Sequence, residues 1–143
     1  MIAESVNLLS GNASIKNIKI IEKQLNDVYV FADKNMLISI IRNLLNNAIK
    51  FTPDYGTVEI ESNLVGQNIE ISVKDSGVGI PQKDIKKLFK IDQSFSTYGT
   101  RNEKGTGLGL ILCKEFVEKN GGKLKVESEP GKGSKFTFTI PQG

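Results

Sequence analysis

One helical stretch constrains the fold of this chain more than any other segment: N-L-L-N-N-A-I-K, from Asn43 to Lys50. Asp33 is a suitable N-cap for a helix that runs through Lys50 or Phe51. Asn43, Asn47 and Lys50 stand at i, i+4 and i+7, so they share one half-buried edge of this helix. The neighbouring stripe is apolar at helical spacing and comprises Leu37, Ile40, Ile41, Leu44 and Ala48.

The asparagines of this edge allow two interpretations. Asparagine is a mediocre helix former, because its side chain competes for nearby backbone groups. Taken alone, the pattern is as typical of a solvated helix face as of a row of oxygen acceptors for a hard cation, with a lysine beside it for phosphate. Mg²⁺ prefers oxygen ligands and usually shares its site with substrate phosphates. Two glycine-rich turns further along the chain decide between these interpretations.

Composition narrows the class of protein. A chain of 143 residues corresponds to one ordinary domain. The net charge of +3 is weak and the lysines are scattered, so nucleic-acid binding is not indicated. No apolar run approaches a membrane span, and no secretory signal follows Met1. A single cysteine gives no disulfide framework, so we expect a domain in the reducing cytoplasm, with a membrane anchor elsewhere in the parent protein left open. Cys113 is the single cysteine and lies among apolar helix residues, which predicts a buried structural thiol.

The chain contains no histidine. This absence excludes Ser-His-Asp and Cys-His nucleophilic sites and an ordinary zinc site. It also excludes a histidine phospho-acceptor within the chain.

The remaining segments alternate between strand and helix patterns. We expect a short helix over 2–9, a second from Pro81 to near Phe89, and a third that follows Gly105–Leu110 and runs to about Lys119. The polar stretch 91–104 is expected to be a long loop. Strands are expected over 15–21, 28–32, 57–63, 69–73, 123–128 and 134–140, with a hairpin loop over 64–68. The prediction is an α+β fold: a two-layer sandwich of a mixed, mostly antiparallel sheet with helices packed on one face.

The first glycine-rich turn is D-S-G-V-G, from Asp75 to Gly79, directly after a predicted strand. An ionised aspartate only accepts hydrogen bonds, so it suits an amino group such as the exocyclic amine of adenine. Glycines let a ligand approach the backbone closely. By itself this pattern also fits an ordinary turn.

The second turn is G-T-G-L-G-L, from Gly105 to Leu110, at the start of a predicted helix. Backbone N–H groups and the helix dipole can point at phosphates there. It is not the dinucleotide fingerprint, because Leu110 takes the place of the last glycine, and the chain has no P-loop lysine motif. A flexible lead into a helix remains the alternative.

Taken in this order, the asparagine-rich helix, D-S-G-V-G, the polar loop and G-T-G-L-G-L resemble the catalytic ATP-binding domain of sensor histidine kinases. That family shares a superfamily with DNA gyrase, heat-shock chaperones and mismatch-repair ATPases. The resemblance covers about 15–141 and implies a Bergerat-type ATP-binding fold, with ATP and Mg²⁺ as cofactors.

The resemblance also implies roles for individual residues. Asn47 matches the Mg²⁺-binding asparagine, Asn43 the asparagine one turn earlier beside the phosphates, and Lys50 the basic residue that contacts phosphate. Asp75 matches the adenine-binding aspartate. The pocket around it would be shaped by Gly77 and Gly79, and the phosphates would meet the second glycine box, which comprises Gly105, Thr106, Gly107, Leu108 and Gly109.

Two aromatic residues and one loop complete the match. Phe89 and Phe95 resemble the F box, although the family often carries F-x-P-F where this chain has Phe89-Lys90-Ile91-Asp92-Gln93-Ser94-Phe95. Core packing is the alternative for both phenylalanines. The stretch 91–104 resembles the ATP lid.

By this resemblance, the chain would donate the γ-phosphate of ATP to a histidine on a dimerisation domain of the same parent protein. We expect that domain to precede Met1, with 1–13 as the tail of a helical connection. The expected context is a two-component phosphorelay with a response-regulator receiver domain as partner and a homodimeric parent protein.

Three alternatives belong to the same superfamily. One is an ATP-hydrolysing conformational machine, whose relatives activate water with a glutamate one turn before the Mg²⁺ asparagine. Asn43 occupies that place here and cannot act as a general base, which favours the kinase. The others are a non-catalytic nucleotide-binding module and a serine-kinase regulator.

Overall fold

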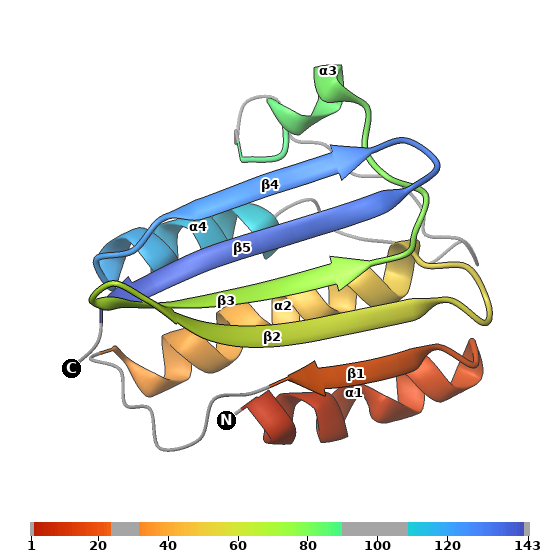
Figure 1. Ribbon diagram of the computed structural model, residues 1–143, viewed down its shortest axis with the longest axis horizontal. Helices are drawn as coiled ribbons and strands as arrows, with labels where there is room; N and C mark the ends of the chain where they lie inside the picture. The colour runs from red at the N-terminus through yellow and green to blue at the C-terminus, as the bar shows by residue number, and fades with distance from the viewer. Residues whose placement is uncertain (1, 24–31, 90–108, 142–143) are drawn as a thin grey trace.

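The computed structural model describes residues 2–23, 32–89 and 109–141, which form two layers (Figure 1). One layer is a five-stranded sheet in the order β1-β2-β3-β5-β4, in which β1 pairs parallel to β2 and the other neighbours are antiparallel. The other layer holds α1, α2 and α4 on one face of this sheet (Figure 1). The predicted α+β sandwich is therefore confirmed. The strands are β1 (Lys19–Lys23), β2 (Thr57–Val65), β3 (Asn68–Asp75), β4 (Leu124–Glu129) and β5 (Gly133–Pro141), and the helices are α1 (Ile2–Ile15), α2 (Lys34–Phe51), α3 (Gln82–Ile85) and α4 (Gly109–Lys119).

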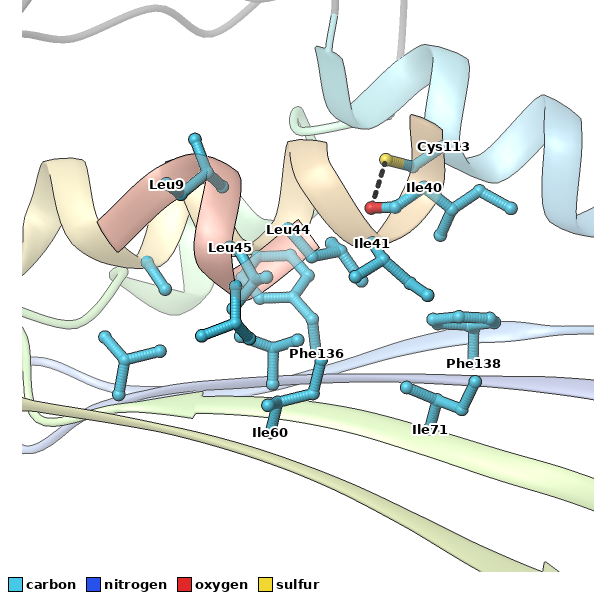
Figure 2. Close-up of a cluster of buried hydrophobic side chains, with 14 of the residues drawn as sticks. Leu9, Ile40, Ile41, Leu44, Leu45, Ile60, Ile71, Cys113, Phe136 and Phe138 are labelled. Atoms are coloured by element: carbon cyan, nitrogen blue, oxygen red, sulfur yellow. Dashed lines mark hydrogen bonds between the residues drawn. The ribbon is translucent and has the colours of Figure 1, made fainter. Parts of the chain in front are cut away.

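Helix α2 is the centre of the helical layer, with α1 on one side and α4 on the other. The predicted apolar stripe is buried, and Leu45 and Ile49 extend it. Phe136 and Phe138 of β5 rise from the sheet toward α2 (Figure 2). Each large side chain buried in this way contributes about 1.5–3 kcal/mol. The core between α2 and the sheet therefore fixes the position of the asparagine-bearing edge.

The predicted start of α2 is confirmed. Asp33 accepts a hydrogen bond from the backbone N–H of Met36 at 3.0 Å, as an N-cap side chain does. The helix ends at Phe51, and Thr52 follows in extended backbone. In the part of the chain that the structure describes, no helix is long and apolar enough to cross a membrane.

Several predicted boundaries near the amino terminus were wrong. The first helix does not end near Leu9 but continues to Ile15, because Val6, Leu9 and Ala13 pack against the core. The strand predicted over 15–21 therefore begins only at Lys19. The strand predicted over 28–32 falls almost entirely outside the described residues, and Ala32 itself is not in a strand.

Two predictions in the middle of the chain were also inaccurate. The loop predicted over 64–68 is a two-residue turn at Gly66-Gln67, because β2 and β3 continue pairing up to Val65 and Asn68. The helix predicted from Pro81 to near Phe89 is helical only over Gln82–Ile85, with turns after it. The predicted loop 91–104 lies outside the described residues.

Candidate nucleotide site

Asp75 ends strand β3 with its side chain on the face that the helices cover. Strand residues alternate between the two faces of a sheet, so Asp75 follows Ile71 and Val73 on the inner face. Only 6% of Asp75 is exposed. Its Oδ1 accepts hydrogen bonds from the backbone N–H of Gly77 at 2.9 Å and of Ser134 at 3.2 Å. These two bonds fix the carboxyl group and leave Oδ2 without a hydrogen bond to any described residue.

Burial raises the pKa of the Asp75 carboxyl above its ordinary value. The hydrogen bonds from Gly77 and Ser134 act in the opposite direction, because they favour the ionised form, but burial is the larger cause. A buried carboxylate that only accepts hydrogen bonds favours a ligand that brings hydrogen-bond donors.

The glycines after Asp75 are required by the packing of the backbone itself. A Cβ at Gly77 would lie 2.4 Å from the carbonyl oxygen of Phe51, at the end of α2. Gly79 has a φ of +75°, and a Cβ there would lie 2.1 Å from the carbonyl oxygen of Glu129. Both distances are shorter than any real contact, so a side chain would push this loop away from α2 and from the β4–β5 turn. The D-S-G-V-G turn is thus a tightly seated loop.

Direct hydrogen bonds join this loop to its neighbours. The backbone N–H of Val78 donates to the carbonyl oxygen of Phe51 at 3.2 Å, and the N–H of Ile80 donates to Oγ of Ser128 at 2.7 Å. The first bond connects the Asp75 loop to the last turn of α2, which carries Lys50. The structure therefore brings Asp75 and the polar edge of α2 to the same end of the sheet.

The polar edge of α2 has the predicted arrangement. Asn43, Asn47 and Lys50 are all half-buried. Asn43 is held by a long hydrogen bond from its Nδ2 to Oγ of Ser39 at 3.4 Å. Asn47 forms no side-chain hydrogen bond with any residue that the structure describes, so its amide oxygen is available as a ligand. The Nζ of Lys50 lies 4.9 Å from the ring centroid of Phe51.

Helix α4 begins against Asn43. A Cβ at Gly109 would lie 3.3 Å from Oδ1 of Asn43, so the start of α4 and the polar edge of α2 are close neighbours. One turn later, the thiol of Cys113 donates to the carbonyl oxygen of Ile40 at 3.8 Å (Figure 2). Burial raises the pKa of Cys113 to about 12. The prediction of a buried structural thiol is confirmed.

Several predicted site residues cannot be placed. Gly105, Thr106, Gly107 and Leu108 lie outside the described residues, as do Phe95 and the lid. Phe89 is described, and it packs half-buried against the hydrophobic core, with Nζ of Lys114 at 5.9 Å from its ring centroid. For Phe89, the described contacts are those of the core-packing alternative.

A groove of about 380 Å³ adjoins the polar edge on the surface of α2. Arg42, Asn43 and Asn46 line it together with Leu9 of α1. Neither Asn47 nor Asp75 contributes to the groove, so it neighbours the candidate nucleotide site at Asn43 without coinciding with it.

The donor set suits Mg²⁺ that is held mainly by phosphates and water. Among the described residues, no three His, Cys, Asp or Glu side chains gather into a cage for a metal ion. Mg²⁺ in nucleotide sites typically takes one or two protein oxygens and keeps several waters. One amide oxygen from Asn47 meets this requirement.

Two residues escaped the sequence analysis. Ser134 supplies a backbone N–H to Asp75 because it is the direct partner of Asp75 across β3 and β5. Knowing the strand pairing would have identified it. Lys16, which follows α1 in the chain, is buried against the end of α2. Most lysines are exposed, and no sequence pattern identifies this one as buried.

The comparisons with known proteins agree with this geometry. The family described as histidine kinase-, DNA gyrase B- and HSP90-like ATPase matches residues 32–143. The chain is 40% identical to the sensor histidine kinase WalK of Bacillus subtilis over 117 residues, which cover 80% of the chain and 19% of WalK. It is 41% identical to the circadian input-output histidine kinase CikA of Synechococcus elongatus over 142 residues, 97% of the chain and 19% of CikA. The chain thus spans about a fifth of the length of these relatives.

A solved structure extends the similarity to three dimensions. The catalytic domain of the histidine kinase ThkA, in a nucleotide-free form, superposes with a TM-score of 0.84 at 33% identity. The match covers 99% of this chain and 90% of that domain.

Proposed function

The chain belongs to the histidine kinase-, DNA gyrase B- and HSP90-like ATPase family and is an ATP-binding catalytic domain of the sensor histidine kinase type, and on this premise we propose how its residues hold Mg²⁺-ATP and which acceptor they serve. Asp75 accepts a hydrogen bond from the adenine amine on Oδ2. Gly77 and Gly79 seat the loop that carries this carboxylate. This ligand contact is supported by Oδ2, which has no hydrogen bond to a described residue, beside an Oδ1 that two backbone N–H groups fix.

The phosphates lie along the polar edge of α2 in this proposal. Lys50 contacts phosphate, Asn43 stands beside the phosphates near the start of α4, and Asn47 offers its amide oxygen to Mg²⁺. When bound, the metal ion neutralises charge on the phosphates. The chain's own residues orient the nucleotide, and in-line phosphoryl transfer depends mostly on such positioning and electrostatics. We assign backbone contacts with phosphate to the second glycine box, Gly105 to Gly109, and the lid to 91–104.

The acceptor is a histidine outside this chain. The chain has no histidine of its own, so it cannot carry the phosphoryl group on that side chain. We place the acceptor on a dimerisation domain of the parent protein, with a response-regulator receiver domain downstream and a cytoplasmic location where ATP is available. Slow hydrolysis is expected, because Asn43 cannot activate water as a glutamate would.

The test combines binding and transfer. We expect calorimetric titration of this chain to give ATP binding that Mg²⁺ strengthens, with negligible phosphate release. Adding radiolabelled ATP and a separately expressed histidine-bearing helical domain should label that domain, whereas its His→Ala variant should stay unlabelled. Steady phosphate release without transfer would contradict the kinase assignment and favour a conformational ATPase.

A further inference from the structure

The last turn of α2 is closed by contacts from three other parts of the chain. A helix leaves its last four carbonyl groups without intrahelical partners. In α2 each of these four accepts a hydrogen bond. The carbonyl oxygen of Ala48 accepts from Oγ1 of Thr52 at 2.6 Å, and the carbonyl oxygen of Phe51 accepts from the N–H of Val78 at 3.2 Å. The two carbonyl groups between them share one donor: Nζ of Lys16 lies 2.9 Å from the oxygen of Ile49 and 3.1 Å from the oxygen of Lys50.

Lys16 is unusual among these donors because it is a cation and is only 2% exposed. Burying an ammonium group is costly unless its donors find acceptors. The carboxyl end of a helix provides such acceptors, and the helix dipole is negative there. The ammonium group of Lys16 donates to two carbonyl groups at once, so it holds two successive peptide units of this turn in one orientation.

The main chain of Lys16 is fixed as well. Its carbonyl oxygen accepts from the N–H of Tyr55 at 2.9 Å, and its N–H donates to the carbonyl oxygen of Ala13 at 3.1 Å. The corner between α1 and β1 is thereby attached both to the end of α1 and to the turn that follows α2. The ammonium group consequently reaches α2 from an anchored backbone.

We propose that Lys16 is a positioning residue for the nucleotide site. By fixing the peptide groups of Ile49 and Lys50, it sets the direction in which the Lys50 side chain leaves α2 and so aligns the Lys50 ammonium group with phosphate. Lys16 does not itself touch the nucleotide. This inference rests on the proposed phosphate contact of Lys50.

The experiment compares Lys16→Met with wild type and with Lys19→Met, which removes an exposed lysine of β1. Affinities for ATP and for adenosine are measured by competition with a fluorescent nucleotide, well below the melting temperature of each variant. In Lys16→Met the misaligned Lys50 should lose its hydrogen bond to phosphate, so ATP binding should weaken about tenfold. Adenosine has no phosphate, so its binding should stay within about twofold of wild type. Lys19→Met should change neither affinity.

A double-mutant comparison separates positioning from general stability. In a Lys50→Met background, Lys16→Met should cause no further loss of ATP affinity, because the group that it positions is gone. If Lys16→Met does not fold, Lys16→Leu, which also lacks a donor, carries the same test. Unchanged ATP affinity in a folded variant, an equal loss for ATP and adenosine, or a full further loss in the Lys50→Met background would each overturn the proposal. Absence of ATP binding by wild type would instead overturn the proposed function, and this role with it.

Discussion

Replacing Asp75 by asparagine should separate nucleotide binding from stability. The substitution keeps the size of the side chain and one oxygen that can accept from the N–H groups of Gly77 and Ser134. It removes the negative charge and replaces Oδ2 with an NH₂ group, which faces the adenine amine as donor against donor. We therefore expect Asp75→Asn to fold normally and to bind ATP poorly.

The size of the binding loss follows from the contact. A hydrogen bond to a charged group contributes about 1.5–3 kcal/mol. Since each 1.4 kcal/mol is about tenfold in affinity, the Kd for ATP should rise about 10- to 150-fold. Adenosine should lose the same factor, because the contact involves the base alone.

The melting temperature of Asp75→Asn at pH 7 should not fall with its ATP affinity. Burial raises the pKa of Asp75, so the folded state binds the proton more tightly than the unfolded state does. The stabilisation from this proton is complete below the ordinary pKa of aspartate and is lost as the pH rises through the raised value. At pH 7 the wild type therefore holds a buried charge that the asparagine variant lacks. The variant should melt at the same temperature as wild type or higher at pH 7, and this advantage should shrink as the pH falls toward 3.

The assay is titration of both proteins with ATP and adenosine at pH 7, with thermal unfolding followed from pH 3 to pH 8. Asp84→Asn, the same chemical change in α3, is the matched control and should leave binding unchanged. Wild-type affinity in Asp75→Asn would refute the adenine contact. A large drop in melting temperature at pH 7 would refute the argument that burial disfavours the charge.

Three further predictions concern the metal, the loop and the thiol. Asn47→Ala should abolish the gain in ATP affinity that Mg²⁺ gives, whereas Asn46→Ala, a substitution at an exposed neighbour, should retain it. Calorimetry with and without Mg²⁺ measures this gain, and a gain retained in Asn47→Ala would show that Asn47 is not the metal ligand. Gly77→Ala should lower the free energy of unfolding by about 1–3 kcal/mol in chemical denaturation, because its Cβ would lie 2.4 Å from the carbonyl oxygen of Phe51. Wild-type stability of this variant would show that the loop can move at little cost. Cys113, with a pKa of about 12, should react with iodoacetamide at pH 8 only when the chain unfolds, so labelling of the native protein within minutes would contradict its burial.

The sequence predicted those parts of the fold in which one periodicity extends over many residues. Helix α2 was predicted from its cap to its end, because Asp33 and a long apolar stripe give the same answer. Strands β2 and β3 followed from alternation. The extension of α1 was missed because Gly11 and its polar neighbours are poor helix formers, and only packing against α2 makes that segment helical.

The candidate site was predictable to the extent that each residue type carries its own chemistry. An aspartate after a strand predicts a hydrogen-bond acceptor, and the asparagines along one helix edge are as typical of a solvated face as of oxygen ligands for a cation. Contacts between distant segments were not recognisable, because they depend on which strands pair. The bond from the Ser134 N–H to Asp75 and the contact of Lys16 with α2 span 59 and 33 positions of the sequence. Neither has a local signal.

The glycines after Asp75 allow two explanations that the sequence pattern does not distinguish. A glycine in a ligand-binding turn is usually explained by close approach of the ligand. Here Gly77 is already required in the free chain, because the loop lies against the carbonyl oxygen of Phe51. The same carbonyl group accepts a hydrogen bond from the N–H of Val78, so the position of the Asp75 carboxylate depends directly on the end of α2. The helix that carries Asn47 and Lys50 thus also sets the position of Asp75, and the distance between the proposed base and phosphate contacts is fixed by the backbone before any nucleotide binds.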